Sequence, residues 1–396
     1  TLFRSCTFTL AKQHVAQFVG SYVRLSDFKG ADQQGPKTLE AIRNKNCGWY
    51  YTAKPDDFKK IPGSPVAYWV SEITRQIFEK NRCVSDVAEI KQGLATCNNG
   101  LFLRLWYEID FNEAKFNCAS QDETSEKKWY PYNKGGGFRK WYGNNEYLVN
   151  WKDKGKDIHL YSELPMHFSG APVRAKNYYF RPGITYGLIS SFGFSARRVD
   201  AGFVFDVGGS MVFPSGDIEP LLAYLSSNLA QYFLRLLNPT LNYQVGVIGK
   251  LPVIQVQGNS KFLFNEPAII AKADWDSFEE SWDFEESPLV SASKDTRLLS
   301  ESFLRWSEVN SNRIAKLKEN EEEINSLFIT AYGLQSELTP EVPESQITLA
   351  RADREKDCER LISYAIGCMM GRYSLDEPGL IYAHGSFACS ESILPA

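Results

Sequence analysis

The residues best suited to chemistry gather in one segment, residues 127–156, where aromatic rings alternate with basic side chains. Eight Lys and Arg stand there against two acids, a local charge of +6 in a 396-residue chain whose net charge is −4. Lys and Arg neutralise phosphates, aromatic faces stack on bases moved out of a duplex, and Asn or Arg side chains read purine edges. The segment therefore predicts contact with DNA. Its rings are Trp129, Tyr130, Tyr132, Phe138, Trp141, Tyr142, Tyr147 and Trp151.

Three sets of side chains are candidates for that contact. Phosphate contacts are expected from the cations Lys127, Lys128, Lys134, Arg139 and Lys140. Base reading or groove contact is expected from the amides Asn98, Asn99, Asn133, Asn144 and Asn145. Basic residues at the ends of later β-type runs are expected to join the same face, namely Arg181, Arg197 and Arg198. The alternative is that half or more of the rings fill a β-domain core and that the charges lie on a solvated surface.

Catalytic motifs are absent from the sequence. It contains no G-x-S-x-G elbow, no G-x-x-x-x-G-K-[ST] phosphate loop, no H-E-x-x-H and no H-x-E with P-C-x-x-C. The four histidines have no Cys or Ser partner in a recognisable motif, so no catalytic residue is predicted. They are His14, His159, His167 and His384.

The glycine run at 134–137 does not predict a nucleotide site. A phosphate-binding loop follows a buried strand and opens a helix. Here Lys134-Gly135-Gly136-Gly137 lies between two aromatic strings. We interpret it as a mobile loop whose glycines let its backbone approach a bulky partner closely.

The cysteines and the hydropathy of the chain indicate the cellular compartment that it occupies. Eight cysteines stand at positions 6, 47, 83, 97, 118, 358, 368 and 389 without a C-x-x-C pair, so free thiols in a reducing cytosol are expected and no metal site is. No run of about 18 uncharged apolar residues occurs, so no membrane span is predicted. The chain begins Thr1-Leu2-Phe3 with neither an initiator Met nor a signal-peptide pattern. We therefore expect it to be the inside of a longer protein.

The periodicity of the chain predicts an α+β fold. Short β-type runs alternate with Gly-, Asn- and Lys-rich turns from about residue 84 to 214, which is typical of a β-rich domain with long loops. Helical patterns follow, one opening at Pro220 and one ending at Gly333 as its C′ residue. Between them, residues 274–286 hold seven acids and no base, which indicates a solvated linker or helix face.

Ahead of the β-rich region, residues 1–60 carry short β-like stretches. A helix is expected to follow the start signal Ser64-Pro65. Its inward face would carry Val66, Trp69, Val70, Ile73 and Ile77.

Several short sequence motifs of unusual composition occur in a fixed order along the chain, and together they resemble those of one known family. With them, most of residues 20–380 resembles the PglX family, the adenine-specific DNA methyltransferases of BREX phage-defence systems. The string at 238–246, running on to 251–253, is similar to the end of the TaqI-like target-recognition domain of that family. The other strings lie at 22–28, 61–69, 93–99, 102–108, 128–136, 139–145, 149–151 and 361–373.

The resemblance implies an organisation and a set of partners. Residues 1–60 would be the tail of the α/β catalytic domain with a connector, 61–80 a bridging helix, and 81–255 the target-recognition domain. Residues 256–300 would be an acidic linker, and 301–396 a helical C-terminal module that is truncated or divergent from 386 onward. Double-stranded DNA, the missing N-terminal catalytic domain and other BREX proteins would be the partners.

The methylating parts of such an enzyme are missing from this sequence. The family needs a Gly-rich turn for S-adenosylmethionine and an [NDS]-P-P-[YFW] motif for the flipped adenine. Neither occurs, and the nearest string, Asn238-Pro239-Thr240-Leu241, lacks the second Pro and the aromatic residue. We expect the parent protein to bind the cofactor and this chain to be inactive alone. A second departure is Cys97, which replaces the second Gly of the family pattern G-x-x-T-G-x-N at 93–99.

Two rival functions remain at this point. One is a non-catalytic aromatic-rich module that binds a carbohydrate or a protein, since exposed Trp and Tyr also stack on sugars. The other is a hydrolase with a Cys or His at its centre, which requires a pocket joining one histidine to a Cys or a carboxylate.

Overall fold

The computed structural model describes residues 6–10, 12–13, 15, 17–163, 173–238, 240–254, 261–293, 296 and 298–381. The chain divides into two compact units, Thr1–Asn81 and Arg82–Ala396. Within the described ranges, no helix is both long and apolar enough to cross a membrane.

The first unit is a small α+β structure. Strand β1 (Gly20–Val23) pairs antiparallel with β2 (Tyr50–Ala53). Its helices are α1 (Ala31–Arg43), α2 (Pro55–Phe58) and α3 (Glu72–Lys80).

The predicted start of the third helix is wrong. Ser64 has φ +47, in the left-handed region, and the helix begins only after Ser71, whose hydroxyl accepts a hydrogen bond from the Thr74 amide at 3.0 Å. This side-chain cap satisfies an amide that the helix leaves without a partner, so it sets the start. Of the predicted inward face, Val70 and Ile77 are buried, whereas Val66, Trp69 and Ile73 are exposed.

Two four-stranded sheets form the β-rich part of the second unit. One has the order β4-β11-β8-β9 and is antiparallel throughout, and the other has the order β10-β6-β7-β5 with β10 parallel to β6. The strands of the first are β4 (Ala88–Lys91), β8 (Gly183–Tyr186), β9 (Ala196–Val199) and β11 (Met211–Pro214). Those of the second are β5 (Leu103–Leu105), β6 (Trp129–Asn133), β7 (Tyr147–Asn150) and β10 (Val204–Phe205). A further pair joins β3 (Arg82–Cys83) to β12 (Pro252–Val253).

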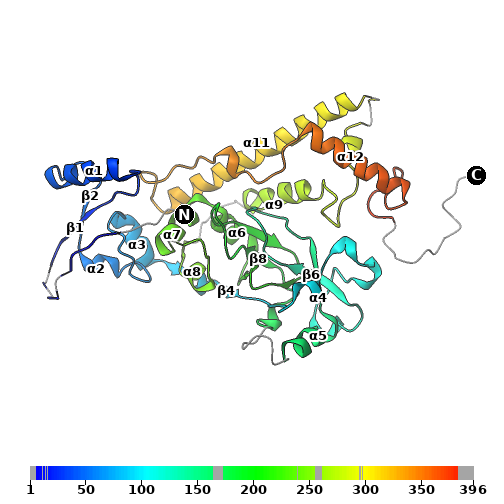
Figure 1. The fold of residues 1–396 in the computed structure, drawn as a ribbon, viewed down its shortest axis with the longest axis horizontal. Helices are drawn as coiled ribbons and strands as arrows, with labels where there is room; N and C mark the ends of the chain where they lie inside the picture. Colours follow the sequence, from blue (N-terminus) through cyan, green and yellow to red (C-terminus); the bar gives the residue numbers. More distant parts are fainter. Residues whose placement is uncertain are drawn as a thin grey trace, which may run out of the picture. The chain divides into compact units, whose positions relative to one another are not determined.

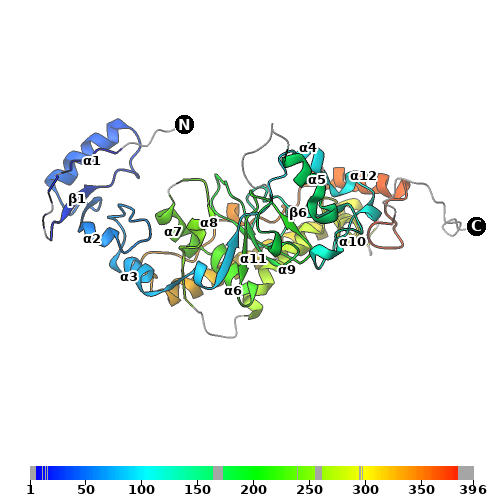
Figure 2. The ribbon, with the colours of Figure 1, turned by 90° about the horizontal axis from the view of Figure 1, so that it is seen from below.

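Rings and aliphatic side chains from both sheets share one core, which includes Leu94, Tyr132, Trp151, Phe205 and Met211. Helices α4 (Asn99–Phe102) and α5 (Lys152–Ser162) lie side by side next to it (Figure 2), where the rings of Phe102 and Tyr161 meet edge to face at 5.4 Å. Short 3-10 turns occur at Val84–Asp86, Trp106–Glu108, Phe111–Glu113, Gln121–Glu123, Lys176–Tyr178 and Glu344–Gln346.

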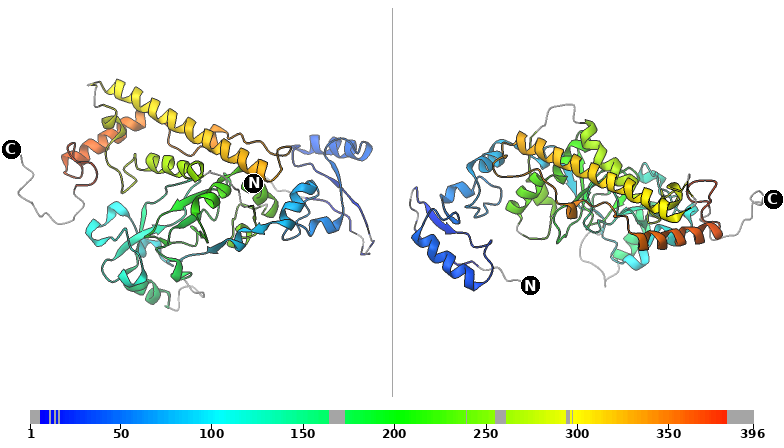
Figure 3. Two further views of the ribbon diagram at one scale, coloured as in Figure 1. Left: turned by 180° about the vertical axis from the view of Figure 1, so that it is seen from behind. Right: turned by 90° about the horizontal axis from the view of Figure 1, so that it is seen from above.

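Helices cover one sheet in successive layers. Helix α6 (Ile218–Ser226) packs on β8, β9 and β11, α9 (Lys261–Trp275) packs on α6, and α11 (Leu299–Ala331) packs on α9 (Figure 1). Helix α12 (Arg354–Met369) lies alongside the first half of α11 (Figure 3), where the Trp306 indole donates to the Asp357 carboxylate at 3.0 Å. The remaining helices are α7 (Asn228–Leu237), α8 (Val245–Ile248) and α10 (Pro288–Ser291). The predicted α+β class, with a β-rich region followed by helices, is confirmed.

Two details of the predicted helices can be compared with the structure. The helix expected from Pro220 is interrupted, because Ser227 caps a new helix by accepting from the Ala230 amide at 3.2 Å. The stop at Gly333 is confirmed: Gly333 has φ +69, and the amides of Gly333 and Leu334 donate to Thr330 and Ile329. These two bonds are the pattern that ends a helix on a left-handed glycine.

The acidic linker predicted for 256–300 is wrong for its described residues. They include α9, α10 and the first residues of α11, and Asp274 on α9 is fully buried. The carboxylate tolerates burial because Arg139 of the β-rich region pairs with it. Residues 261–293 are therefore part of the packed second unit.

Candidate nucleic-acid interface

The basic segment does not form a single patch. Lys127 and Lys128 precede β6 and Lys134 follows it, so about 20 Å separates the two ends at about 3.3 Å per residue. Lys152 belongs to the end with Lys128, because the adjacent Trp151 amide donates to the Lys128 carbonyl at 3.1 Å. The +6 charge counted along the sequence is therefore divided between the two ends of the sheet.

Arg139 and Lys140, both predicted to touch phosphate, are occupied inside the protein. The Arg139 guanidinium lies 2.9 Å from Asp274 and donates to the Tyr142 carbonyl at 2.7 Å. The Lys140 ammonium is buried against the Glu321 carboxylate, which also accepts from the Trp141 indole at 2.7 Å. These cations tie the loop after β6 to α9 and α11, so their assignment to phosphate is wrong in this structure.

Arg197 and Arg198 likewise have partners within the protein. Arg197 is 0% exposed and donates to the carbonyls of Gly135 and Arg139, the second at 3.3 Å. Burial lowers its pKa to about 10, with the positive charge of Arg139 adding to the effect. Arg198 pairs with Asp200 at 3.0 Å and with Glu219 at 2.8 Å. Arg197 braces the sheet and its loops inside the protein, whereas the Arg198 side chain is paired but remains about a third exposed.

The candidate amides are mostly structural as well. Asn133 is buried, donates to the Gly209 carbonyl at 3.2 Å and accepts from the Gly135 amide. Asn98 caps α4 and donates to the Tyr161 hydroxyl at 3.1 Å. Asn145 is buried, and half-buried Asn144 donates to the Gly137 carbonyl at 3.1 Å. Among the five, Asn99 is exposed, with its side-chain oxygen accepting from Thr96.

Besides the paired Arg198, four candidate cations retain access to solvent, but not on one face. Lys128 is exposed and lies 5.2 Å from the Trp129 ring, beside half-buried Lys127. Exposed Arg181 lies over the Tyr178 ring at 5.2 Å and precedes β8. Half-buried Lys134 stands at the other end of β6, 4.0 Å from Asp206.

The aromatic rings of the segment fill the core, as the alternative interpretation proposed. Six of the eight rings in residues 127–156 are buried, and Phe138 and Tyr147 are half-buried. Tyr132, for example, donates to the Asp206 carboxylate at 2.6 Å, and burial raises its pKa well above the usual value. The prediction that this segment offers a row of stacking platforms is therefore wrong.

Loops at the Lys134 end of the sheets form a different candidate surface, which we call the loop rim. It comprises residues 134–138, 187–194, 206–209 and 240–244. The Leu188 amide donates to Gly208 at 3.1 Å, and the Tyr243 amide donates to Leu188 at 2.7 Å. Ser190 and Leu241 are joined in the same way at 3.2 Å. Three of these segments, far apart in sequence, thus meet through backbone hydrogen bonds.

Gly135 allows the closest of these approaches. It has φ +90, and a Cβ there would lie 2.5 Å from the Gly208 carbonyl oxygen. The loop leads on to Trp141 without opening a helix, so it lacks the helix N-terminus on which a nucleotide phosphate would rest. Its glycine admits a neighbouring loop of the same chain.

The loop rim exposes three large apolar side chains that sequence reasoning missed. Phe192 is 81% exposed, Ile189 68% and Leu241 56%. Residues 187–194 and 240–249 contain no Asp or Glu, while Arg235 on α7 is exposed and close enough to affect the pKa of Tyr243. The available sequence signal was the string from Gly187 to Gly193, in which turn residues bracket apolar ones.

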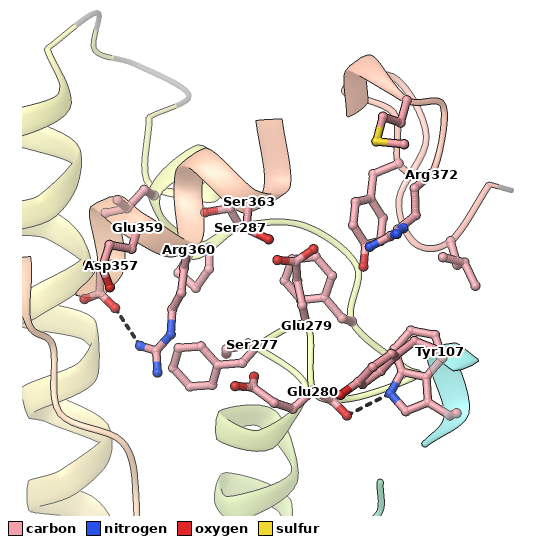
Figure 4. A pocket seen from close by; sticks show the side chains of 18 of the residues that line it. Tyr107, Ser277, Glu279, Glu280, Ser287, Asp357, Glu359, Arg360, Ser363 and Arg372 are labelled. Carbon is pink, nitrogen blue, oxygen red and sulfur yellow. Dashed lines mark hydrogen bonds and ion pairs between the residues drawn. The ribbon is translucent and has the colours of Figure 1, made fainter. Parts of the chain in front are cut away.

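A cavity of about 1090 Å³ lies elsewhere in the second unit, among the 106–111 segment, residues 277–289 and α12 (Figure 4). Glu279 and Glu280 face it from one side, and Arg360, paired with Asp357 at 2.9 Å, faces it from another. Its lining includes neither His nor Cys. It therefore lacks the nucleophile and base that the hydrolase alternative requires.

The histidines give no support to a hydrolase either. His159 lies on α5, half-buried, and its pKa is lowered by burial and by the nearby Lys176. His14, His167 and His384 lie outside the described residues. Within the ranges that the structure describes, no cluster of three metal-ligating side chains occurs, and the seven described cysteines are free thiols.

Comparison with known proteins gives a clear relationship. The chain is 37% identical over 399 residues to the adenine-specific methyltransferase PglX of Lacticaseibacillus casei (strain Zhang), covering 98% of this chain and 33% of that protein. It is 31% identical over 403 residues to the adenine-specific methyltransferase BrxX of Escherichia coli O9:H4 (strain HS), covering 96% and 31%. No family model matches.

One solved structure is also similar, the type IIL restriction-modification enzyme MmeI in complex with DNA. The similarity covers 72% of this chain and 36% of that one, at 14% identity and a TM-score of 0.37, which is too low to support a conclusion. The sequence relationship is the stronger finding. Over nearly its whole length the chain is a homologue of the adenine-specific methyltransferases PglX and BrxX, as its motifs predicted, and it spans about a third of the length of each.

Proposed function

We propose that this chain is the DNA-recognition portion of a site-specific adenine-N6 DNA methyltransferase of a BREX-type phage-defence system. One observation carries the proposal: 96 to 98% of the chain aligns with adenine-specific methyltransferases, yet its 396 residues hold neither the [NDS]-P-P-[YFW] motif nor a Gly-rich cofactor turn. A homologous part without the reactive motifs is best explained as the part that selects the target.

In this proposal the loop rim approaches the duplex. Lys134 and Arg235 supply positive charge beside residues 187–194 and 240–244, which carry no acid. The one acid of the rim, Asp206, lies 4.0 Å from Lys134 and accepts hydrogen bonds from the Tyr132 hydroxyl and the Gly208 amide. The side-chain amide of Gln244, which is exposed on the same rim, has the chemistry that reads base edges. Lys127, Lys128 and Arg181 would contact phosphate only where the DNA extends past the opposite end of the sheets.

The rest of the enzyme would do the chemistry. The remainder of the parent protein would bind S-adenosylmethionine and present its methyl group to the amino group of a flipped adenine. The 301–381 helices would brace the recognition domain and contact other BREX proteins. Free thiols agree with a cytoplasmic enzyme.

A protein-binding role is the second candidate, and one observation favours it. Ile362, Ile366 and Met369 are exposed on α12 at helical spacing. A carbohydrate-binding role has less support, because all the Trp and Tyr rings of residues 127–156 except the half-buried Tyr147 are buried.

The experiment that tests the proposal is a salt titration of the 396-residue chain with fluorescent duplex DNA. Each phosphate contact contributes about 0.9 to the slope of log K against log salt. Lys134→Ala should weaken binding and lower the slope by about one, whereas Lys134→Arg should keep the slope. Lys318→Ala on α11 is the control and should change nothing. Binding that is absent, or that does not respond to salt, would refute the proposal.

A further inference from the structure

The tip of the loop rim is an apolar cluster held at the surface. Phe192 and Ile189 lie on the loop between β8 and β9, and Leu241 lies on the neighbouring segment. Single exposed apolar residues are ordinary, but here three are carried by two segments that pair through Ser190 with Leu241 and through Ile189 with Asn242. The cluster is a structural feature of the paired loops.

The loop behind Phe192 is anchored. Phe194 is buried against the Tyr186 and Tyr243 rings at 5.4 and 5.2 Å, and the Gln231 side chain of α7 hydrogen-bonds both its amide and its carbonyl. The Phe192 amide donates to the Ser190 hydroxyl at 3.3 Å, and the Phe138 ring lies 6.3 Å from the Phe192 ring. These contacts anchor the backbone that carries Phe192, so the loop loses little conformational freedom when it binds, which is what preorganisation requires.

The surroundings of the tip fit a polyanion with an apolar interior. Residues 187–194, 240–249 and α7 contain no acid, and α7 carries the exposed Arg235. Lys134 stands on the same rim, where the single acid Asp206 lies 4.0 Å from it. Cations around an apolar tip match the phosphates and the base stack of a duplex. An apolar protein partner would match the tip but would offer no anionic groups for the cations to contact.

We infer that Phe192 inserts between base pairs of the bound DNA, with Ile189 and Leu241 packing against the opened step. The inference rests on the proposed function and deepens it. A wedge of this kind unstacks one step, and an unstacked step makes it easier to extrude a base for modification. Phe192 would thus be a positioning residue that prepares the DNA for the reacting half of the enzyme.

The test compares a paired duplex with one that carries a central mismatch, using the full 396-residue chain. A mismatch lowers the cost of opening a step, so the wild-type chain should bind the mismatched duplex several-fold more tightly. Phe192→Ala should abolish that preference and weaken binding by roughly 5- to 100-fold, the range of one base-stacking contact, while the salt slope stays the same. Phe192→Trp should retain the preference.

Phe262→Ala is the matched control, because Phe262 is 72% exposed but lies on α9. It should leave both duplexes bound as by the wild-type chain. Equal affinity for the two duplexes, or a preference that survives Phe192→Ala, would overturn the wedge while DNA binding itself stands. Self-association that Phe192→Ala removes without changing DNA affinity would also overturn it. Failure of all salt-dependent binding would instead refute the proposed function.

Discussion

The Lys140 ammonium is buried against the Glu321 carboxylate, which joins the loop after β6 to the long helix α11 across 181 residues of sequence. The Trp141 indole donates to the same carboxylate at 2.7 Å. One buried carboxylate therefore holds two consecutive residues of the loop that begins at the loop rim. The helical layer positions the candidate DNA surface through this contact.

Glu321→Ala should destabilise the second unit strongly, because it leaves the Lys140 charge buried without a partner. The expected loss is about 3–5 kcal/mol in the free energy of unfolding. Urea unfolding of the purified chain measures it. Glu319→Ala, which removes an exposed pair with Lys316, should cost less than about 1 kcal/mol. Similar losses in the two variants would contradict the role given to Glu321.

Arg139→Ala should reduce stability and leave the salt slope of DNA binding unchanged. The sequence alone predicted the opposite, a weaker slope from a lost phosphate contact. The structure places the guanidinium 2.9 Å from buried Asp274, so we expect a loss of about 2–3 kcal/mol, the range for a charged hydrogen bond. Thermal unfolding and the salt titration separate the two outcomes, and a slope reduced by one in a stable variant would restore the first interpretation.

Gly135→Ala should be costly and Gly137→Ala should not. Gly135 has φ +90 and a neighbouring carbonyl in the way of a Cβ, whereas a Cβ at Gly137 would meet nothing within 4 Å. We expect a loss of about 1–3 kcal/mol for the first variant from backbone strain alone. The Gly135→Ala variant should also bind DNA more weakly, because Gly135 positions the loop rim. Denaturant unfolding and DNA affinity, measured on both variants, test this pair.

Alkaline pH should destabilise the fold from about pH 10 upward. Burial raises the pKa of Tyr130 and of Tyr142 to about 12, above the usual value of 10. A phenol whose pKa is higher in the folded state contributes stability below pH 10, and that contribution is lost as the pH rises through 12. Unfolding followed by phenolate absorbance should show these rings ionising together with loss of structure. Ionisation near pH 10 in a chain that stays folded would contradict their burial.

The sequence was informative where the determining interactions are local. Alternating β-type runs predicted the β-rich region, and the left-handed glycine at 333 predicted the end of α11, since each depends on neighbouring residues. The start of α3 was predicted too early because Ser64-Pro65 has the residue types of a cap, whereas in the structure the hydroxyl of Ser71 makes the capping bond.

The candidate site was less predictable because its determinants are distant in sequence. The partner of Arg139 lies 135 residues away and that of Lys140 lies 181 residues away, so a charge count could not tell internal ion pairs from a free surface. The loop around Phe192 carries no charge, and its only sequence signal was the turn residues that bracket apolar ones between Gly187 and Gly193. The exposure of this loop depends on its pairing with residues 240–243, and only the folded chain brings the two segments together.

The most direct test of the central claim is hydrogen exchange of the 396-residue chain with and without duplex DNA at low salt. If the loop rim is the interface, DNA should slow exchange in residues 187–194 and 240–244 and leave the middle of α11 unchanged. Protection confined to the Lys127 and Lys128 end of the sheets, or to α12, would contradict the account.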